Sequence, residues 1–177
     1  MMVRLERFNI YLLVALALAL SSGCRTPEGK KKKQAATLRL HVEASPFEKG
    51  HTQTVSISRE HPTSITVEKE AFVTEAFVAE AKVMPTLGGF AISLQFDRRG
   101  KLLLEQYSAA NRGKRFAVFA QFGEGLKEGR WLGAPVITRN ISDGAFTFTP
   151  DASREEADEI VLGLNNIAKK VQDKKDW

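Results

Sequence analysis

FAISLQFDRRGKLLLEQYSAAN, residues 90–111, passes from a strand pattern straight into a helix pattern and decides the fold. Phe90–Phe96 is a clear strand by its aromatic and β-branched content. Asp97 stands where a helix N-cap belongs, because its carboxylate can accept hydrogen bonds from the free amides of the first turn. Arg98–Asn111 then carries apolar side chains near helical spacing, and Gly113 is a stop signal. The residues at that spacing are Leu102, Leu103, Tyr107 and Ala110.

Three more strands are expected directly downstream. Arg115–Phe122 and Trp131–Thr138 are predicted strands, separated by a glycine-rich loop at 123–130. Ala145–Thr149 is a short strand, and Ser142-Asp143-Gly144 before it is a β-turn rather than a nucleophile site.

The last helix is the best-defined element of the sequence. Ser153 and Glu156 fit a capping box, in which the serine caps the helix and the glutamate reaches back. Lys169 and Lys170 suit the negative end of the helix dipole, and residues 173–177 are expected to fray. One apolar stripe at helical spacing comprises Ala157, Ile160, Val161, Leu164, Ile167, Ala168 and Val171.

Upstream of residue 90 the pattern is that of strands. Thr37–Ala44 and Gln53–Ser58 alternate apolar and polar side chains on either side of a turn at 45–52, so we expect them to pair as a hairpin. Ser64–Lys69 repeats the strand pattern. Phe72–Met84, rich in Ala, Val and Glu, is ambiguous; one interpretation is a single turn at 75–77 before a strand at Val78–Met84.

These elements predict an α+β domain over residues 37–172. Its mixed or antiparallel sheet carries two amphipathic helices packed on one face and is preceded by an N-terminal β-hairpin. Two helices cover only one face of such a sheet. The other face is therefore solvated, covered by the hairpin or used for binding.

The order of the motifs resembles the head part of the first periplasmic domain of SecD, the auxiliary subunit of the bacterial Sec translocase. The resemblance covers roughly Ser64 to Asn166. It rests on a strand-to-helix junction, two further strand motifs, a helix start and an upstream extended segment. These are Ser93-Leu94-Gln95-Phe96-Asp97-Arg98-Arg99-Gly100, Gly113-Lys114-Arg115-Phe116-Ala117-Val118, Ala134-Pro135-Val136-Ile137, Phe148-Thr149 with Glu155-Glu156-Ala157, and Val67-Glu68-Lys69-Glu70-Ala71-Phe72-Val73.

The resemblance implies contact with polypeptides rather than catalysis, because the SecD head is thought to touch translocating chains. The sequence departs from the family in two places: the loop 123–130 is longer, and Leu164-Asn165-Asn166 replaces the usual end of the last helix. A SecD also has six membrane-spanning helices. No stretch after the first 23 residues is apolar enough to span a bilayer, so we expect no proton-driven motor.

The N-terminus is typical of an exported protein. Residues 1–23 have a basic start and an eleven-residue apolar run, Ile10–Leu20, which suits a signal peptide better than a membrane anchor. The small residues before Cys24 resemble the lipobox of bacterial lipoproteins, so cleavage between Gly23 and Cys24 and acylation of Cys24 are expected. Ser21 stands where the lipobox is usually aliphatic. The alternative is ordinary signal-peptidase cleavage that leaves Cys24 as a free thiol.

The positive charge of the chain lies in a short tether. The net charge is +5, yet residues 34–177 carry 19 basic and 19 acidic side chains. Residues 24–36 are expected to form a basic, flexible linker. Lys30, Lys31, Lys32 and Lys33 either contact anionic headgroups or act as a solubilising spacer. No basic, aromatic-interleaved patch follows, so nucleic-acid binding is not expected, and Arg25 after the cysteine favours the outer membrane over the inner.

No residue pattern indicates an active site, a metal or a cofactor, and we expect a protein that is not an enzyme. His41, His51 and His61 recur every ten residues, but no Asp, Glu or Cys completes a ligand set, and surface histidines are expected. The glycine-rich stretch 123–133 lacks a following helix to cradle a phosphate. The acidic pairs 155/156 and 158/159 suit a solvated helix start.

Two functions remain open. In the first, a membrane-anchored, periplasm-facing lipoprotein binds exported polypeptides or a Sec-type envelope partner through the SecD-head-like domain. In the second, the protein is structural and self-associates. Exposed aromatic side chains would mark a binding patch, and the candidates are Trp131, Phe119, Phe122 and Phe146, which otherwise belong to the core.

Overall fold

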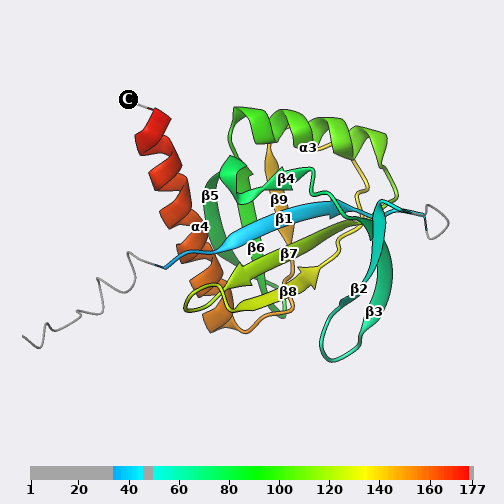
Figure 1. Ribbon diagram of the computed structural model, residues 1–177, viewed down its shortest axis with the longest axis horizontal. Helices are drawn as coiled ribbons and strands as arrows, with labels where there is room; N and C mark the ends of the chain where they lie inside the picture. Colours follow the sequence, from blue (N-terminus) through cyan, green and yellow to red (C-terminus); the bar gives the residue numbers. More distant parts are fainter. Residues whose placement is uncertain (1–33, 46–49, 176–177) are drawn as a thin grey trace, which may run out of the picture. The chain divides into compact units, whose positions relative to one another are not determined.

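The computed structural model describes residues 34–45 and 50–175, so the expected signal peptide lies outside the described residues. Nine strands, two α-helices and one 3₁₀ turn lie within these ranges (Figure 1). The strands are β1 (Thr37–Val42), β2 (Thr52–Ile57), β3 (Thr63–Glu68), β4 (Val73–Thr74), β5 (Val78–Thr86), β6 (Gly89–Phe96), β7 (Phe116–Phe122), β8 (Glu128–Gly133) and β9 (Ala145–Phe148). The helical elements are η1 (Glu75–Phe77), α3 (Arg98–Ala110) and α4 (Arg154–Lys175).

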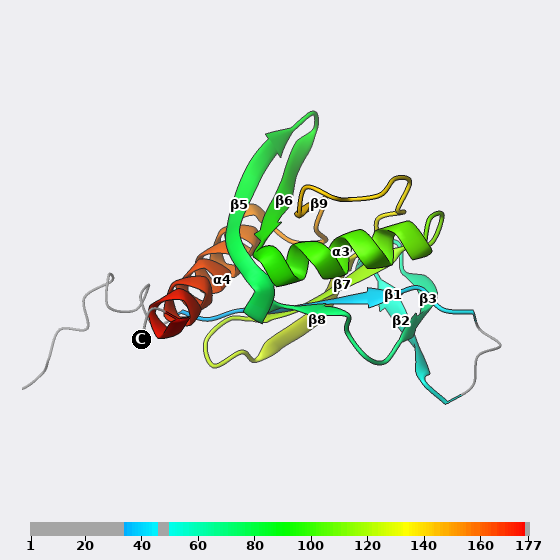
Figure 2. The same ribbon diagram turned by 90° about the horizontal axis from the view of Figure 1, so that it is seen from above.

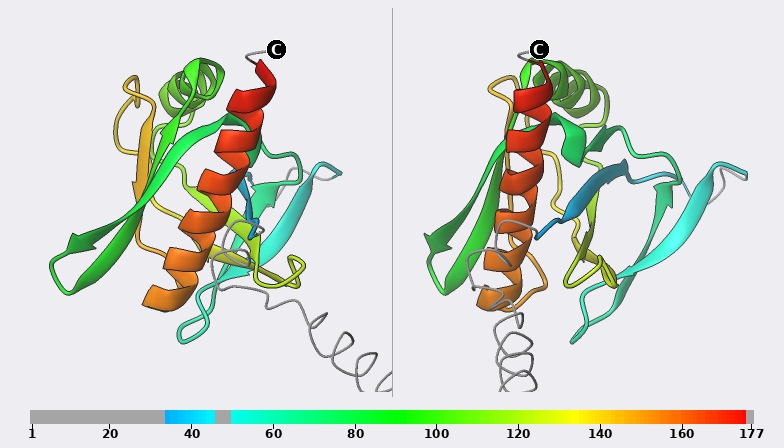
Figure 3. Two further views of the ribbon diagram at one scale, coloured as in Figure 1. Left: turned by 90° about the vertical axis from the view of Figure 1, so that its left-hand side faces the viewer. Right: turned by 60° about the vertical axis from the view of Figure 1, so that its left-hand side comes forward.

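The expected α+β architecture is confirmed, with its strands shared among three antiparallel sheets. The sheets have the orders β4-β1-β7-β8, β5-β6-β9 and β2-β3. The β2–β3 and β5–β6 hairpins lie on opposite sides of the domain (Figures 2 and 3). Within the described residues no helix is both long and apolar enough to cross a membrane.

One core joins the two larger sheets to both helices. Alternate side chains of β1 and β7 face inwards and meet those of β6 and β9, and α4 packs along β5 and the end of β1. The largest fully buried side chains of this core are Leu38, Leu40, Ile92, Leu94, Leu104, Phe116, Phe122, Leu132, Phe146, Ile160 and Leu164.

The expected hairpin between residues 37–44 and 53–58 is wrong, although a hairpin is present in this region. β2 pairs with β3, whereas β1 lies between β4 and β7. Alternation shows which side chains of a strand are buried but not which strand is its partner. Because most side chains of β1 are buried, the strand belongs in the middle of a covered sheet. Pairing with β7, which is distant in sequence, places it there.

The buried line of α3 differs from the expected apolar spacing. The helix buries Gly100, Leu104 and Ser108, while Leu102 is 58% exposed. A Cβ at Gly100 would lie 2.8 Å from the Cβ of Phe77, so the first turn of the helix abuts η1. A glycine and a serine on the buried side leave no hydrophobic signal in the sequence. The expected cap is confirmed, since Asp97 Oδ1 accepts from Gly100 N at 2.9 Å.

β8 begins and ends earlier than the expected strand at 131–138. Glu128–Arg130 already pair with β7, so the loop is confined to 123–127. Over the rest of the expected strand, residues 134–138, the strand pairing is an isolated bridge between Val136 and Arg115. Gly123 and Gly125 take positive φ values of 81° and 72°, which lets the chain turn before it pairs.

The expected start and stripe of α4 are confirmed. Ser153 N donates to Glu156 Oε2 at 2.7 Å, and Glu156 N donates to Ser153 Oγ at 3.2 Å. The helix continues to Lys175. A Cβ at Gly163 would lie 2.5 Å from Ala36 N, and Asn166 Nδ2 donates to Gln34 O at 2.9 Å. Residues 34–36 therefore lie directly against the middle of α4.

Candidate functional site

The four-stranded sheet has an outer face that points away from the core and is only partly covered. Arg39, Phe119 and Trp131 lie side by side across β1, β7 and β8 on this face. The rings of Phe119 and Trp131 are 5.2 Å apart and half-buried. A pair of accessible aromatic rings on a sheet is a surface to which apolar side chains can bind.

The β2–β3 hairpin covers the neighbouring part of the outer face through one edge of β3. Ala44 N donates to Thr66 O at 2.9 Å, and His41 Nδ1–H donates a hydrogen bond to Glu68 O at 2.8 Å. His41 also contacts Trp131 edge-on, at 5.0 Å between the ring centroids. Beneath the hairpin lies a small apolar cluster of Ile57, Ile65, Val67 and Ala117.

A groove of about 330 Å³ lies where the hairpin ends and the aromatic pair begins; we call it the outer groove. The β2–β3 register directs the main-chain groups of Thr54 and Ser56 away from β3, so one edge of β2 is open beside it. The outer groove is lined by Ser56, Ser58, Arg59, Phe119, Gly129, Arg130, Trp131 and Asp151.

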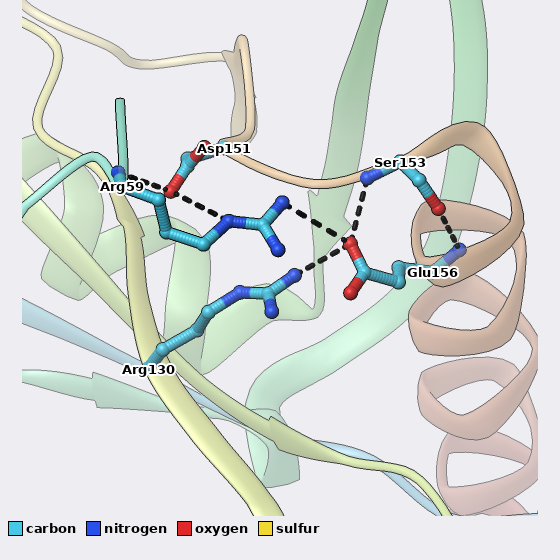
Figure 4. Close-up of polar contacts among 5 residues, drawn as sticks. All are labelled: Arg59, Arg130, Asp151, Ser153 and Glu156. Atoms are coloured by element: carbon cyan, nitrogen blue, oxygen red, sulfur yellow. Dashed lines mark hydrogen bonds and ion pairs between the residues drawn. The ribbon is translucent and has the colours of Figure 1, made fainter. Parts of the chain in front are cut away.

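Two arginines and two carboxylates fix the rim of the outer groove (Figure 4). Arg59, just after β2, bonds to Asp151 Oδ2 through its main-chain N at 2.9 Å and approaches the same oxygen with Nε at 3.4 Å. Its Nη2 lies 3.6 Å from Glu156 Oε2, and Arg130 Nη2 from β8 lies 2.6 Å from that oxygen. The rim thus ties the end of the hairpin and β8 to the start of α4.

Charge compensation holds Glu156 ionised within this rim. Burial raises the pKa of Glu156, but hydrogen bonds from Arg130 and Ser153 N–H and the charges of Arg130 and Arg59 outweigh it, so the pKa lies below its usual value. The Arg130 guanidinium also stacks over the Phe122 ring at 5.0 Å. Its buried Nε has no hydrogen-bond acceptor among the described residues.

The four candidate aromatic residues divide evenly between core and surface. Phe122 and Phe146 are buried in the core, with exposed fractions of 0% and 2%. Phe119 and Trp131 are the half-buried pair beside the outer groove. Alternation along β7 and β8 produces this division, because each of these strands has one side in the core and one on the outer face.

The three histidines do not come together. The expectation of surface histidines is wrong for His41, which is buried under the hairpin. The pKa of His41 is lowered, mainly because burial penalises the imidazolium. His51 and His61 are exposed, just before β2 and in the β2–β3 turn. Within the part of the chain that the structure describes, no three His, Cys, Asp or Glu side chains could hold a metal.

The predicted lipidation and cleavage residues, Cys24 and Gly23, lie outside the described residues. The same is true of the predicted membrane-contact residues Lys30, Lys31, Lys32 and Lys33.

Sequence reasoning missed the rim residues Arg59, Arg130 and Asp151, because no local pattern joins three segments that are far apart in the chain. The only signal available was the acidic residue Asp151 just before the capping box.

Comparisons with known proteins identify the family. The model of the SecDF P1 head subdomain matches residues 52–168, from the start of β2 into α4. No curated protein matches the chain.

Two solved SecDF structures share the fold. One, described as a membrane component SecDF that enhances protein export, has a TM-score of 0.54 and 24% identity, over 82% of this chain and 69% of that chain. The other, a crystal structure of SecDF in a super-membrane-facing form, has a TM-score of 0.54 and 25% identity, over 77% of this chain. This chain corresponds to 20% of the length of that second protein. The resemblance noted from the sequence is thus confirmed: the chain belongs to the SecDF P1 head subdomain family.

Proposed function

We propose that this protein is a non-catalytic envelope lipoprotein that binds extended polypeptides in its outer groove, in connection with protein export. The observation that carries the proposal is the half-exposed Phe119–Trp131 pair beside an open strand edge. The aromatic rings offer apolar contact, and the free main-chain groups of β2 offer hydrogen bonds to any extended chain, whatever its sequence. The solved relative described as enhancing protein export makes an exported chain the natural ligand.

The rim supports binding rather than chemistry. Its two carboxylates are each engaged by an arginine, so they form a fixed wall. Charges that neutralise one another leave the groove without a strong preference for the charge of its ligand. Such a groove suits a protein that handles many different chains.

Binding is tested with a fluorescently labelled, reduced and carboxymethylated protein that cannot fold, titrated with the full chain in lipid nanodiscs. Replacing Phe119 with serine is expected to weaken binding about tenfold, since an aromatic anchor is lost. Leu102→Ser is the matched control, because Leu102 is an exposed apolar residue on α3. Absence of binding by the wild-type chain, or equal loss in both variants, contradicts the proposal.

The anchor is tested separately by mass spectrometry of the mature protein. Acylation predicts an N-terminal peptide that begins at Cys24 and carries lipid, in the outer-membrane fraction. Cys24→Ser is expected to remove the lipid and release the protein from membranes. A mature chain with an unmodified Cys24 thiol contradicts the anchor but leaves the binding proposal standing. The structural alternative predicts instead that the full chain forms a defined oligomer in sizing experiments.

A further inference from the structure

A second cavity, separate from the outer groove, lies between β9 and the segment that follows β8. Its volume is about 230 Å³, and we call it the seam. The two cavities have no lining residue in common. The seam is lined by Pro135, Val136, Ile137, Thr138, Arg139, Ile141, Ala145, Phe146 and Thr147.

The first wall of the seam is the free edge of β9. Phe96 N donates to Gly144 O at 2.9 Å, and the β6–β9 register pairs Leu94 with Phe146 and Ser93 with Thr147. In an antiparallel ladder the bonded pairs alternate, so Phe146 bonds to β6 while the N–H and C=O of Thr147 point away from it. β9 is an edge strand that pairs only with β6. The main chain of Thr147 is therefore free to bond across the seam.

The second wall is the extended segment around Val136. Phe116 N donates to Pro135 O at 3.0 Å, and Ile137 N donates to Lys114 O at 2.8 Å. Since neighbouring residues of an extended chain point their main-chain groups in opposite directions, those of Val136 point away from β7. They have no hydrogen-bond partner among the described residues. Both walls therefore offer unpaired donors and acceptors.

Two local contacts flank the seam. At one end Gly133 meets β9, where a Cβ on the glycine would lie only 3.1 Å from Thr149 O. At the other end Asp143 Oδ1 accepts from Ala145 N at 3.0 Å and holds the turn before β9. Of the β9 residues that line the seam, Ala145–Thr147, only Thr147 has both main-chain groups free, so the seam suits a short extended segment.

Parts of two other strand edges in the described residues are occupied. Asn165 of α4 bonds to both main-chain groups of Ala81 on β5, at 2.8 and 2.9 Å. On β8, Asp151 N donates to Leu132 O at 2.6 Å. The open edge of β2 can bond to an added strand on one side only, whereas the seam can bond to it on both.

We propose that the seam takes up a short extended segment of another polypeptide, which adds as a strand to β9 and bonds to Thr147 on one side and Val136 on the other. This inference rests on the proposed function for the class of ligand and adds a second, main-chain-directed binding site. Main-chain groups in an alternating pattern are the chemistry that only an extended chain supplies. The side chain of Val136 is 49% exposed and offers the ligand an apolar contact in the seam. The side chains of Ile137, Ile141 and Phe146 are buried in the core beneath it.

Amide hydrogen exchange locates the binding site directly. A threonine- and valine-rich hexapeptide is added to the full ¹⁵N-labelled chain in detergent micelles. The amides of Thr147 and Val136 are expected to exchange fast in the free protein and at least about tenfold more slowly with saturating peptide. Phe146 and Ile137 are internal controls, because their amides are bonded in either state.

Two variants of the experiment separate main-chain pairing from apolar contact. The same peptide with alternate N-methylated amides is expected to bind about tenfold more weakly, since it loses hydrogen bonds but keeps its side chains. Thr147→Pro removes the outward N–H at a strand edge that tolerates proline and is expected to abolish peptide binding. Thr147→Ala keeps that N–H and is expected to bind as wild type. If Thr147→Pro fails to fold, the N-methylated peptide still tests the pairing.

The outcomes distinguish this inference from the proposed function. Peptide binding without protection of Thr147 and Val136, or equal affinity for the N-methylated peptide, overturns the seam as the site and leaves the outer groove standing. Binding of the unfolded protein without binding of the hexapeptide likewise overturns the seam as a binding site and leaves the outer groove standing. Absence of binding by both probes overturns both.

Discussion

Replacing Asn165 with alanine tests how the edge of β5 is closed. The Asn165 side chain accepts from Ala81 N at 2.8 Å and donates to Ala81 O at 2.9 Å, as a neighbouring strand would. Ala81 is 2% exposed, so these main-chain groups have little access to water. Alanine at position 165 leaves both without a partner while keeping the helix intact.

The magnitude follows from the two lost hydrogen bonds. Each is worth about 0.5–1.5 kcal/mol net, and a buried group left unpaired costs about 1–3 kcal/mol. Alanine has the better helix propensity and returns roughly 0.5 kcal/mol. We therefore expect Asn165→Ala to lower the free energy of unfolding by about 2–3 kcal/mol, which corresponds to roughly 6–12 °C in Tm for a domain of this size.

Urea denaturation followed by circular dichroism measures this difference, with the m-value expected to stay constant. Lys169→Ala is the control, because Lys169 is exposed on the same helix and its loss is expected to change stability by less than about 0.5 kcal/mol. If Asn165→Ala unfolds within that margin of the wild-type protein, the bonds to Ala81 do not close the edge.

Three further predictions concern the packing and the pH dependence of the domain. Gly163→Ala places a Cβ against Ala36 and is expected to destabilise the domain by about 1–3 kcal/mol in the same assay, so an unchanged midpoint would mean that residues 34–36 are not held there. Because the pKa of His41 is lowered, the folded state binds a proton at this residue less tightly than the unfolded state does. The free energy of unfolding is therefore full above pH 6.5 and falls as the pH drops below that value. Between pH 7.5 and 5.5 the urea midpoint of His41→Asn is expected to vary less than that of the wild type. Because the pKa of Glu156 is lowered, its contribution to the free energy of unfolding is complete above the usual carboxyl pKa of 4.5 and is lost as the pH falls further. Glu156→Gln is therefore expected to lose less stability than the wild type between pH 4.5 and lower pH. An equal loss in both proteins would mean that the ion pairs of the rim do not cause it.

Local features of the fold could be predicted from the sequence. The caps at Asp97 and Ser153 depend on residues three positions apart, so the sequence alone identifies them. The stretch 72–84 was ambiguous from local pattern, and the structure agrees with the interpretation of a turn at 75–77 followed by a strand. The resemblance of the motifs to SecD then identified the family, because it used their order over roughly residues 64–166.

Features that depend on distant contacts could not be predicted. The partner of β1 is β7, nearly eighty residues further along the chain, and alternation within β1 contains no information about it. The buried line of α3 uses Gly100 and Ser108, which no hydrophobic pattern selects. The rim of the outer groove joins three segments, and its charges were visible in the sequence only as ordinary surface residues.

The pattern of closed and open strand edges favours a polypeptide as the ligand. An exposed edge invites aggregation, and proteins usually cover it. Here β3 is covered by Ala44 and His41, β5 by Asn165 and part of β8 by Asp151. The open edges of β2 and β9 each adjoin a cavity with apolar side chains. A small molecule would need the cavities but not the free main-chain groups, whereas an extended chain uses both.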